Sequence, residues 1–179
     1  MAEAFSNKLS RAVGIVTTAT GGSIGVTTNK ITGISTTGIG VSDFVDNTNY
    51  IAGTIVESLG ISTVWVNRDS TNTAAATNQS LTFLGVTTAY TSAAATKSIL
   101  IGGTFANNTN SSVNLSVETW DQSASVGVCI ASKIPVPSGS SFVISDTGKT
   151  LLEAKDEVRV YCDTANGIDV NLTILTGVS

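Results

Sequence analysis

Apolar and polar residues alternate along the second half of the chain, as expected for β-strands that bury one face. Val113, Leu115 and Val117 occupy every second position, and the residues between them are polar. The alternation recurs in residues 126–130, 142–144, 158–162 and 168–174. Antiparallel strands with one apolar face pack best as two sheets. Residues 85–179 are therefore predicted to form an antiparallel β-sandwich of the jelly-roll or immunoglobulin-like kind.

The first half carries a different pattern, in which short β-branched runs are separated by glycine. Such runs, with glycine or Asn/Asp turns between them, predict a small barrel or sandwich over residues 21–84. Residues 43–47 are predicted to form a turn. Residues 68–80 carry almost no bulky apolar groups and are predicted to be a loop or linker. The expected fold is thus all-β, a sandwich with an additional small glycine-rich module.

Residues 1–20 have two interpretations. Phe5, Leu9 and Val13 recur at every fourth position, which gives the apolar stripe of a short helix. A helix of about three turns is marginal in isolation, so the segment is expected to be an N-terminal arm that docks on a neighbour or a first strand of the sheet. Residues 11–19 resemble residues 83–90. The sandwich therefore begins near residue 11 or near residue 85, with the glycine-rich module inserted or prefixed.

Composition narrows the classes of function. The chain has no histidine and only 12% charged residues, against roughly 25% in an ordinary soluble domain. A net charge of −4 and a pI near 4.6 disfavour nucleic acid as a partner, because that binding depends on clustered Lys and Arg. The apolar runs are far shorter than the ~20 residues of a membrane-spanning helix, so no membrane partner is expected. A mean hydropathy of +0.28 predicts contacts with other subunits.

Residues suited to catalysis are sparse. Without histidine, no nucleophile–histidine pair can form. The carboxylate pairs lie at turns, where Asp and Asn are favoured for backbone hydrogen bonding alone. No catalytic residue, metal ligand or cofactor is therefore predicted. Cys129 and Cys162 are expected to be buried free thiols, with a disulfide as the alternative.

Four side chains are candidate interface residues: Phe5, Leu9, Trp65 and Trp120. Phe5 and Leu9 form the apolar side of the N-terminal segment. Trp65 alternates with two valines, so it is predicted to lie on the opposite face of its strand from both. Trp120 ends an alternating segment. Tryptophan is a frequent anchor of protein interfaces, and a place in the core or at its rim is the alternative for both tryptophans.

Two groups of motifs carry a resemblance to a known family. The first group comprises residues 99–107, 134–140, 151–156 and 158–175, and the second comprises residues 41–45, 51–56 and 60–64. The first group resembles a β-sandwich of structural proteins in tailed bacteriophages, especially phages of marine cyanobacteria. The second is similar to β modules repeated in cyanophage virion and fibre proteins. Lys155 stands where the family's turn between strands has glycine. The resemblance implies a non-catalytic virion protein.

The leading hypothesis is a capsid decoration protein that binds the assembled head as a homotrimer. Its partners would be the major capsid protein or other virion proteins, and further copies of itself. A neck, collar or tail-fibre-base protein is the first alternative, followed by a host-glycan-binding module and then by an enzyme. The first residues lack the features of a secretory signal. Synthesis in the host cytoplasm and a final place in the virion are therefore expected.

Overall fold

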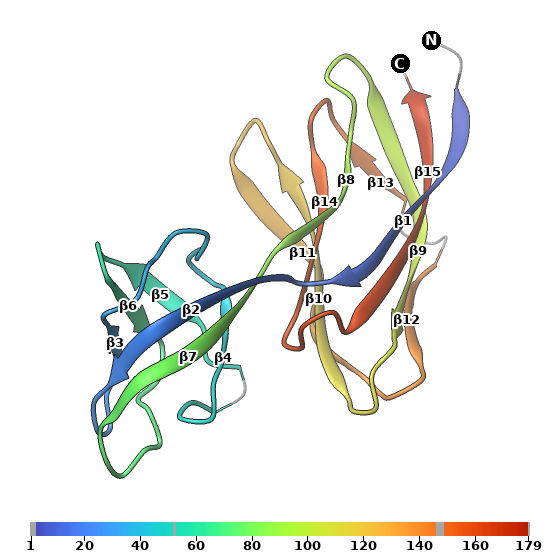
Figure 1. Cartoon of the computed structure of the whole chain (residues 1–179). Helices are drawn as coiled ribbons and strands as arrows, with labels where there is room; N and C mark the ends of the chain where they lie inside the picture. The colour runs from blue at the N-terminus through green and yellow to red at the C-terminus, as the bar shows by residue number, and fades with distance from the viewer. Residues whose placement is uncertain (1–2, 52, 146–148, 179) are drawn as a thin grey trace. The chain divides into compact units, whose positions relative to one another are not determined.

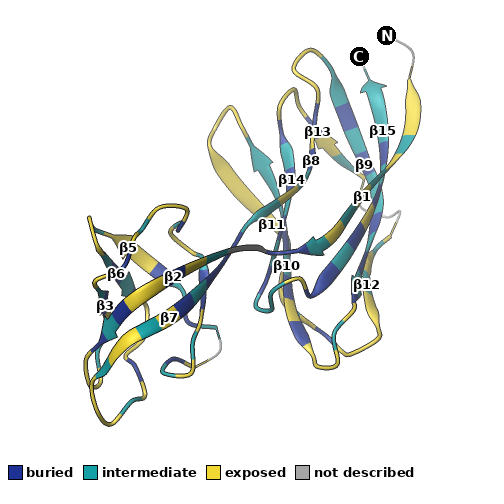
Figure 2. Ribbon diagram, in the orientation of Figure 1, coloured by how far each residue is buried: buried dark blue, intermediate teal, exposed yellow. Residues whose placement is uncertain are grey.

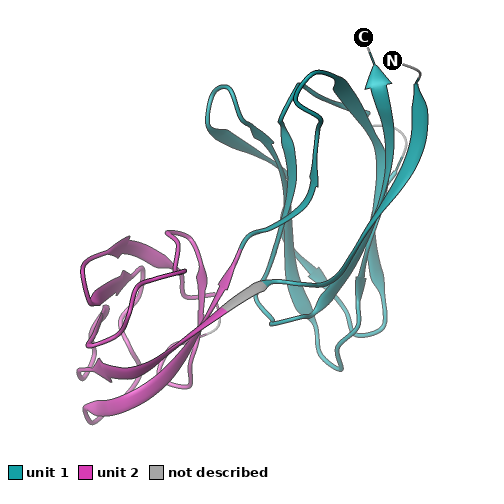
Figure 3. Ribbon diagram, turned by 45° about the horizontal axis from the view of Figure 1, so that its top comes forward, with its two compact units in different colours: residues 1–14, 86–179 teal, residues 15–85 magenta. Residues whose placement is uncertain are grey.

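A computed structural model describes residues 3–51, 53–145 and 149–178, although not the side chains of residues 15 and 16. The described residues form strands and turns and contain no helix (Figure 1). The chain divides into two compact units (Figure 3). The larger unit comprises residues 1–14 and 86–179, and the smaller unit comprises residues 15–85. Each unit has a hydrophobic core of its own.

In the larger unit, the residues that the structure describes form two antiparallel sheets. The five-stranded sheet has the order β1 (Ala4–Val13), β15 (Ile168–Val178), β9 (Lys97–Asn107), β12 (Ser141–Ile144), and β13 (Thr150–Leu152) also pairs with β9. The four-stranded sheet has the order β11 (Val126–Val136), β10 (Val113–Asp121), β14 (Glu157–Cys162), β8 (Thr87–Thr91). Apolar side chains from both sheets form one core, so the unit is the predicted antiparallel β-sandwich.

Most of the positions that the alternation predicts to be buried lie in this core. Leu115 and Val117 of β10, Val160 of β14 and Leu172 of β15 are completely buried. Figure 2 shows the alternation as bands of buried and exposed residues along the strands. Strand β11 is the exception, because Val126 and Val128 are exposed. Neither valine belongs to the core of the sandwich. The prediction that these two valines face the core was therefore wrong.

The N-terminal segment is a strand and not a helix. β1 pairs with β15 in register from Ala4↔Thr176 to Ser10↔Val170. Pairing with β15 gives the backbone the hydrogen bonds that a short isolated helix supplies poorly. A spacing of four residues also places Phe5 and Leu9 on one face of a strand, so the apolar stripe fits both structures. Of the two interpretations, the structure shows the first strand of the sheet.

The described residues of the smaller unit form one antiparallel sheet of six strands. Its order is β4 (Phe44–Asp46), β7 (Ala76–Gly85), β2 (Ile15–Ile24), β3 (Lys30–Thr32), β6 (Thr63–Val66), β5 (Val56–Leu59). The outermost strands approach each other, because Val45 donates to the carbonyl of Thr54 at 2.8 Å and Val56 donates to that of Asp43 at 2.9 Å. The curved sheet encloses a core that includes Ile31 and Phe83.

Two sequence-based predictions for this unit were wrong in part. Residues 43–47 are not merely a turn, since Phe44 and Val45 are buried in strand β4. Residues 76–80 belong to strand β7 and not to a loop. Propensity missed β7 because its first residues are small or polar, whereas pairing with β2 decides their conformation. The remaining loop is fixed by Ser70, which is buried and donates to the Gly25 carbonyl at 3.2 Å.

The smaller unit is inserted between two strands of the sandwich. The chain completes β1 at Val13, forms the whole smaller unit, and returns at Thr87 in β8. Its two connecting segments are paired at Ile15↔Gly85. The similar residues 11–19 and 83–90 thus contain the two crossings between units. The sequence alone left insertion and prefixing open, and the structure shows insertion.

The turn before β14 holds its geometry without glycine. Lys155 has φ of +70°, a conformation that L-residues with a Cβ rarely adopt. Asp156, almost fully buried, accepts hydrogen bonds from the backbone of Glu153 at 2.9 Å and of Gln122 at 3.1 Å. The backbone N–H of Lys155 also donates to the Ser92 carbonyl at 3.2 Å. These contacts hold Lys155 in the conformation for which glycine is favoured.

We predict that Lys155→Gly stabilises the protein. Relief of the left-handed strain, about 1–2 kcal/mol, exceeds the roughly 0.5–1 kcal/mol entropic cost of a glycine. The free energy of unfolding, measured by urea denaturation, should therefore rise by about 0.5–1 kcal/mol. Lys155→Ala is the matched control, because it removes the same side chain but keeps the Cβ, and it should give no gain. A Lys155→Gly protein less stable than the wild type would contradict this account of the turn.

Candidate functional site

The four predicted interface residues lie on three different surfaces. Phe5 and Leu9 share the exposed face of β1, and each is 75% exposed. Trp120 is half-buried on β10, in the other sheet of the sandwich. Trp65 is half-buried on β6 of the smaller unit, and its neighbours Val64 and Val66 are buried, as the alternation predicted. The structure therefore brings together only Phe5 and Leu9.

An apolar row crosses the outer face of the five-stranded sheet. Phe5 of β1 is opposite Leu175 of β15, and Leu175 is opposite Ile99 of β9. Ile99 is in turn opposite Leu151 of β13. Phe5 and Leu151 are exposed, and Leu175 and Ile99 are partly buried. We call these four residues the apolar row. Side chains directly opposite on one face lie within contact distance, so the row is a continuous stripe over four strands.

The sequence contained a signal for this row that its analysis missed. Ile99, Leu151 and Leu175 each stand next to another apolar residue in the same strand. Successive side chains of a strand point to opposite faces. An apolar pair therefore places one residue in the core and one on the outer face, as buried Leu152 and exposed Leu151 show. Which sheet carries the outward residues depends on which strands pair with one another, and the sequence does not give that pairing.

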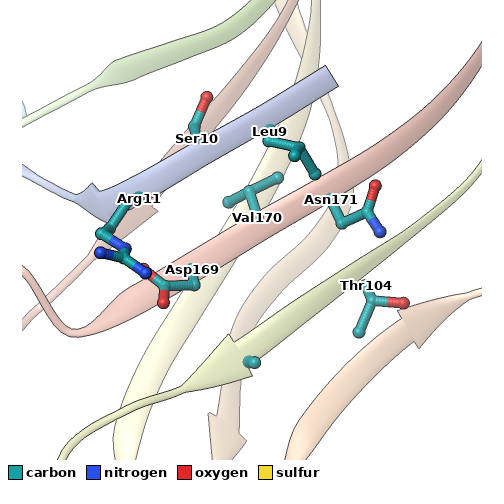
Figure 4. A pocket seen from close by; sticks show the side chains of 8 residues that line it. Leu9, Ser10, Arg11, Thr104, Asp169, Val170 and Asn171 are labelled. Atoms are coloured by element: carbon teal, nitrogen blue, oxygen red, sulfur yellow. The ribbon is translucent and has the colours of Figure 1, made fainter. Parts of the chain in front are cut away.

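A hollow lies beside Leu9 on the face of the sheet that carries the apolar row. It has a volume of about 440 Å³ and is lined by residues of β1, β15 and β9. Figure 4 shows Leu9, Thr104 and Asn171 among the side chains around it. Asp169, at one end, accepts a hydrogen bond from the backbone of Ala12 at 2.8 Å, which fixes the irregularity near the end of β1. The hollow is thus part of the outer face of the five-stranded sheet, and its lining combines apolar and neutral polar groups with the charged residues Arg11 and Asp169.

The outer face of the four-stranded sheet carries a polar cluster instead. The guanidinium carbon of Arg159 lies 3.8 Å from the ring centroid of Trp120. Its Nε is 2.7 Å from Glu157 Oε2, and its Nη1 is 4.0 Å from Glu118 Oε1. Thr88 also donates to Glu157. Cation–π contact and ion pairing therefore satisfy Arg159 within the sheet. One face of the Trp120 ring is covered, which limits its use as an anchor.

Tyr161 completes this cluster through its hydroxyl. It donates a 2.6 Å hydrogen bond to Glu118 Oε1. Burial raises the pKa of Tyr161 well above its usual value, and the bond to Glu118 raises it further. The hydroxyl therefore stays protonated and remains a donor at neutral and moderately alkaline pH. Tyr161 thus stabilises the cluster, because its hydroxyl proton makes the hydrogen bond to Glu118.

The two cysteines differ in their surroundings. Cys162 is buried, and its thiol donates to the carbonyls of Thr164 at 2.9 Å and Val13 at 3.4 Å. Burial raises the pKa of this thiol, which disfavours the reactive thiolate. Cys129 is exposed on β11, so the prediction that both thiols are buried was wrong for Cys129. Both are free, and the alternative of a disulfide does not apply.

The smaller unit exposes single apolar side chains at its turns. Ile61, between β5 and β6, is fully exposed, and the Trp65 ring lies close to the backbone of the neighbouring Gly60. Lys30 Nζ lies 5.6 Å from the centroid of that ring. Tyr50 donates to the Thr28 carbonyl at 3.3 Å, and burial raises its pKa to about 12. These contacts stabilise the turns, and they bring no cluster of reactive groups together.

Over the described ranges, no group of three or more Cys, Asp or Glu side chains is arranged to hold a metal ion. No helix within those ranges has the length and apolarity to cross a membrane. Comparisons with protein-family models, curated proteins and solved structures found no match. The candidate site is the apolar row together with the hollow beside Leu9, because exposed apolar side chains on a paired sheet suit contact with another protein surface.

We predict that Tyr161 makes stability fall at alkaline pH. Its pKa is raised in the folded protein relative to the unfolded value of 10.0. Above about pH 10 the unfolded chain therefore loses a proton that the folded chain keeps, and the free energy of unfolding decreases with pH. Tyr161→Phe cannot ionise, so its stability should fall less steeply between pH 9 and 11, as measured by urea denaturation. Profiles that run parallel for wild type and variant would contradict this assignment.

Proposed function

We propose that this chain is a non-enzymatic structural protein of a tailed phage, and specifically a decoration protein that binds the assembled head. The observation that carries the proposal is the apolar row on the outer face of the five-stranded sheet. An exposed apolar stripe on a paired sheet marks a surface for protein contact. The sequence resemblance to phage structural proteins supplies the setting, and the acidic, histidine-free composition agrees with a binding role.

The row suits attachment to a repetitive protein surface. Complete burial of one Phe or Leu side chain contributes about 1.5–3 kcal/mol, so four partly exposed side chains give a modest contact. Val143 of β12, exposed on the same face opposite Thr104, adds to it. The paired strands hold these side chains in place before binding, which lowers the entropic cost of association. Weak contacts can give strong overall binding when several copies of this protein are linked and the particle offers each of them an equivalent site.

We predict that purified particles of the parent phage contain this protein at a copy number that scales with the major capsid protein. Quantitative mass spectrometry measures that ratio, and immunogold labelling locates the protein on the particle. A copy number that matches the neck or tail symmetry, with label only below the head, would reject decoration and favour the neck, collar or fibre-base alternative. Absence from the particle would reject a virion role altogether.

The proposed contact surface on the five-stranded sheet is tested with variants in β12 and β13, which β9 and β15 separate from β1. Leu151→Ser and Val143→Ser place polar groups on the outer face of the five-stranded sheet, and both positions are exposed, so folding should be preserved. We expect the double variant to occupy undecorated heads at least tenfold less than the wild type, which corresponds to about 1.4 kcal/mol. Ile61→Ser, at a fully exposed position of the smaller unit, is the control. Equal loss in the control would contradict the assignment of the surface.

A further inference from the structure

Strand β1 ends the five-stranded sheet. It pairs with β15 on one side, and among the described strands none pairs with it on the other. It is ten residues long and contains no proline. An exposed edge of this length presents unpaired N–H and C=O groups to which another strand can add. This edge of β1 is therefore available for pairing with a strand of another chain.

The residues of β1 are complementary to themselves in an antiparallel arrangement. Phe5, Leu9 and Arg11 of β1, and Glu3 directly before the strand, are exposed at alternate positions around the exposed Asn7. With Asn7 on a twofold axis, Phe5 of each copy lies opposite Leu9 of the other. In the same register, Glu3 lies opposite Arg11. Two apolar pairs and two opposite-charge pairs thus form together, and each kind stabilises an antiparallel pair by roughly 0.2–1 kcal/mol.

Neighbouring registers lack this match. A twofold axis at Ser6 places Phe5 opposite Asn7 and leaves Leu9 opposite Glu3. An axis at Lys8 places two lysines directly opposite each other, which is unfavourable. With the axis at Asn7, Lys8 lies opposite Ser6 on the other face of the strand, so no like charges meet directly. Apolar contact and charge therefore select the same register.

We propose that two copies of this protein associate through antiparallel pairing of their β1 strands, with the Asn7 residues at the twofold axis. The five-stranded sheets then become one continuous sheet across the dimer. The apolar row, which ends at Phe5, continues onto Leu9 of the partner. An isologous contact of this kind closes with two copies, whereas the sequence suggested a trimer. The pairing does not depend on the proposed role in a virion.

The dimer is expected to dissociate on dilution. A single pair of strands buries less than the ~1,200 Å² of a stable protein interface, so a dissociation constant in the micromolar range is expected. Sedimentation velocity of the full chain should show monomer and dimer in proportions that change with concentration. A monomer at every concentration, or a trimer as the associated species, would overturn the proposal.

Charge variants test the register. Glu3→Arg places two arginines opposite each other in each pair, and Arg11→Glu places two glutamates, so each variant alone should dimerise at least tenfold more weakly than the wild type. Mixing the two variants restores both opposite-charge pairs in a heterodimer. Association of the mixture at near wild-type strength supports the register, and a mixture as weak as either variant alone overturns it. Both positions are exposed, and circular dichroism of each variant verifies folding.

A cross-link provides an independent test. Directly opposite residues of an antiparallel pair have Cα atoms about 4.5–5.5 Å apart, within the range of a disulfide. In a Cys129→Ser background, which removes the exposed thiol, Asn7→Cys should form a disulfide-linked dimer under mild oxidation. Ser10→Cys is the matched control on the same strand, because the thiols introduced at position 10 of the two copies would be far apart in this register. Cross-linking no faster at position 7 than at position 10 would overturn the proposed pairing.

Discussion

The pairing of β1 with β15 is the constraint on which the sandwich depends. It joins the first described strand to the last, and the hydrogen bond from Ala12 to Asp169, 157 positions apart in sequence, strengthens it. The smaller unit lies between them in sequence, so the loop that this pairing closes includes the whole of that unit. Contacts of such long range carry a high entropic cost of loop closure and slow the folding of β proteins. The paired Ile15 and Gly85 reduce that cost, because they bring the two ends of the insertion together.

The same strand that closes the sandwich also leaves it open to association. β1 satisfies one of its edges with β15 and presents the other, together with the exposed side chains of Phe5 and Leu9. Many proteins protect such an edge with proline, bulges or inward-facing charge. Here the irregularity of β1 lies near its end, between Ser10 and Val13, and leaves the first seven residues of the strand regular. One edge of β1 thus closes the sandwich by pairing with β15, and its other edge is the one proposed to pair with a second copy.

The two outer faces of the sandwich differ in what they leave unsatisfied. On the four-stranded sheet, Arg159 is engaged by Trp120 and Glu157, and Tyr161 is engaged by Glu118. Arg159 and Tyr161 have little to gain from a further partner, since a new contact would first have to break these ones. Within this cluster, Trp120 Nε1 is buried without a hydrogen-bond partner. On the five-stranded sheet, Phe5 and Leu151 face solvent and gain free energy from any apolar surface that covers them. This asymmetry favours the five-stranded sheet as the surface of the proposed protein contact.

The sequence by itself determined the all-β class and much of the core, because strict alternation at Val113, Leu115 and Val117 leaves only one face to bury. It also marked Phe5 and Leu9 as candidates for contact, although the same spacing fits a helix. Tertiary structure alone decided that β1 joins β15, that the small unit is inserted, and that Ile99, Leu151 and Leu175 align. The physical reason is that alternation specifies which face of a strand is apolar but not which strand lies beside it. A surface built across several strands exists only once their order and register are set.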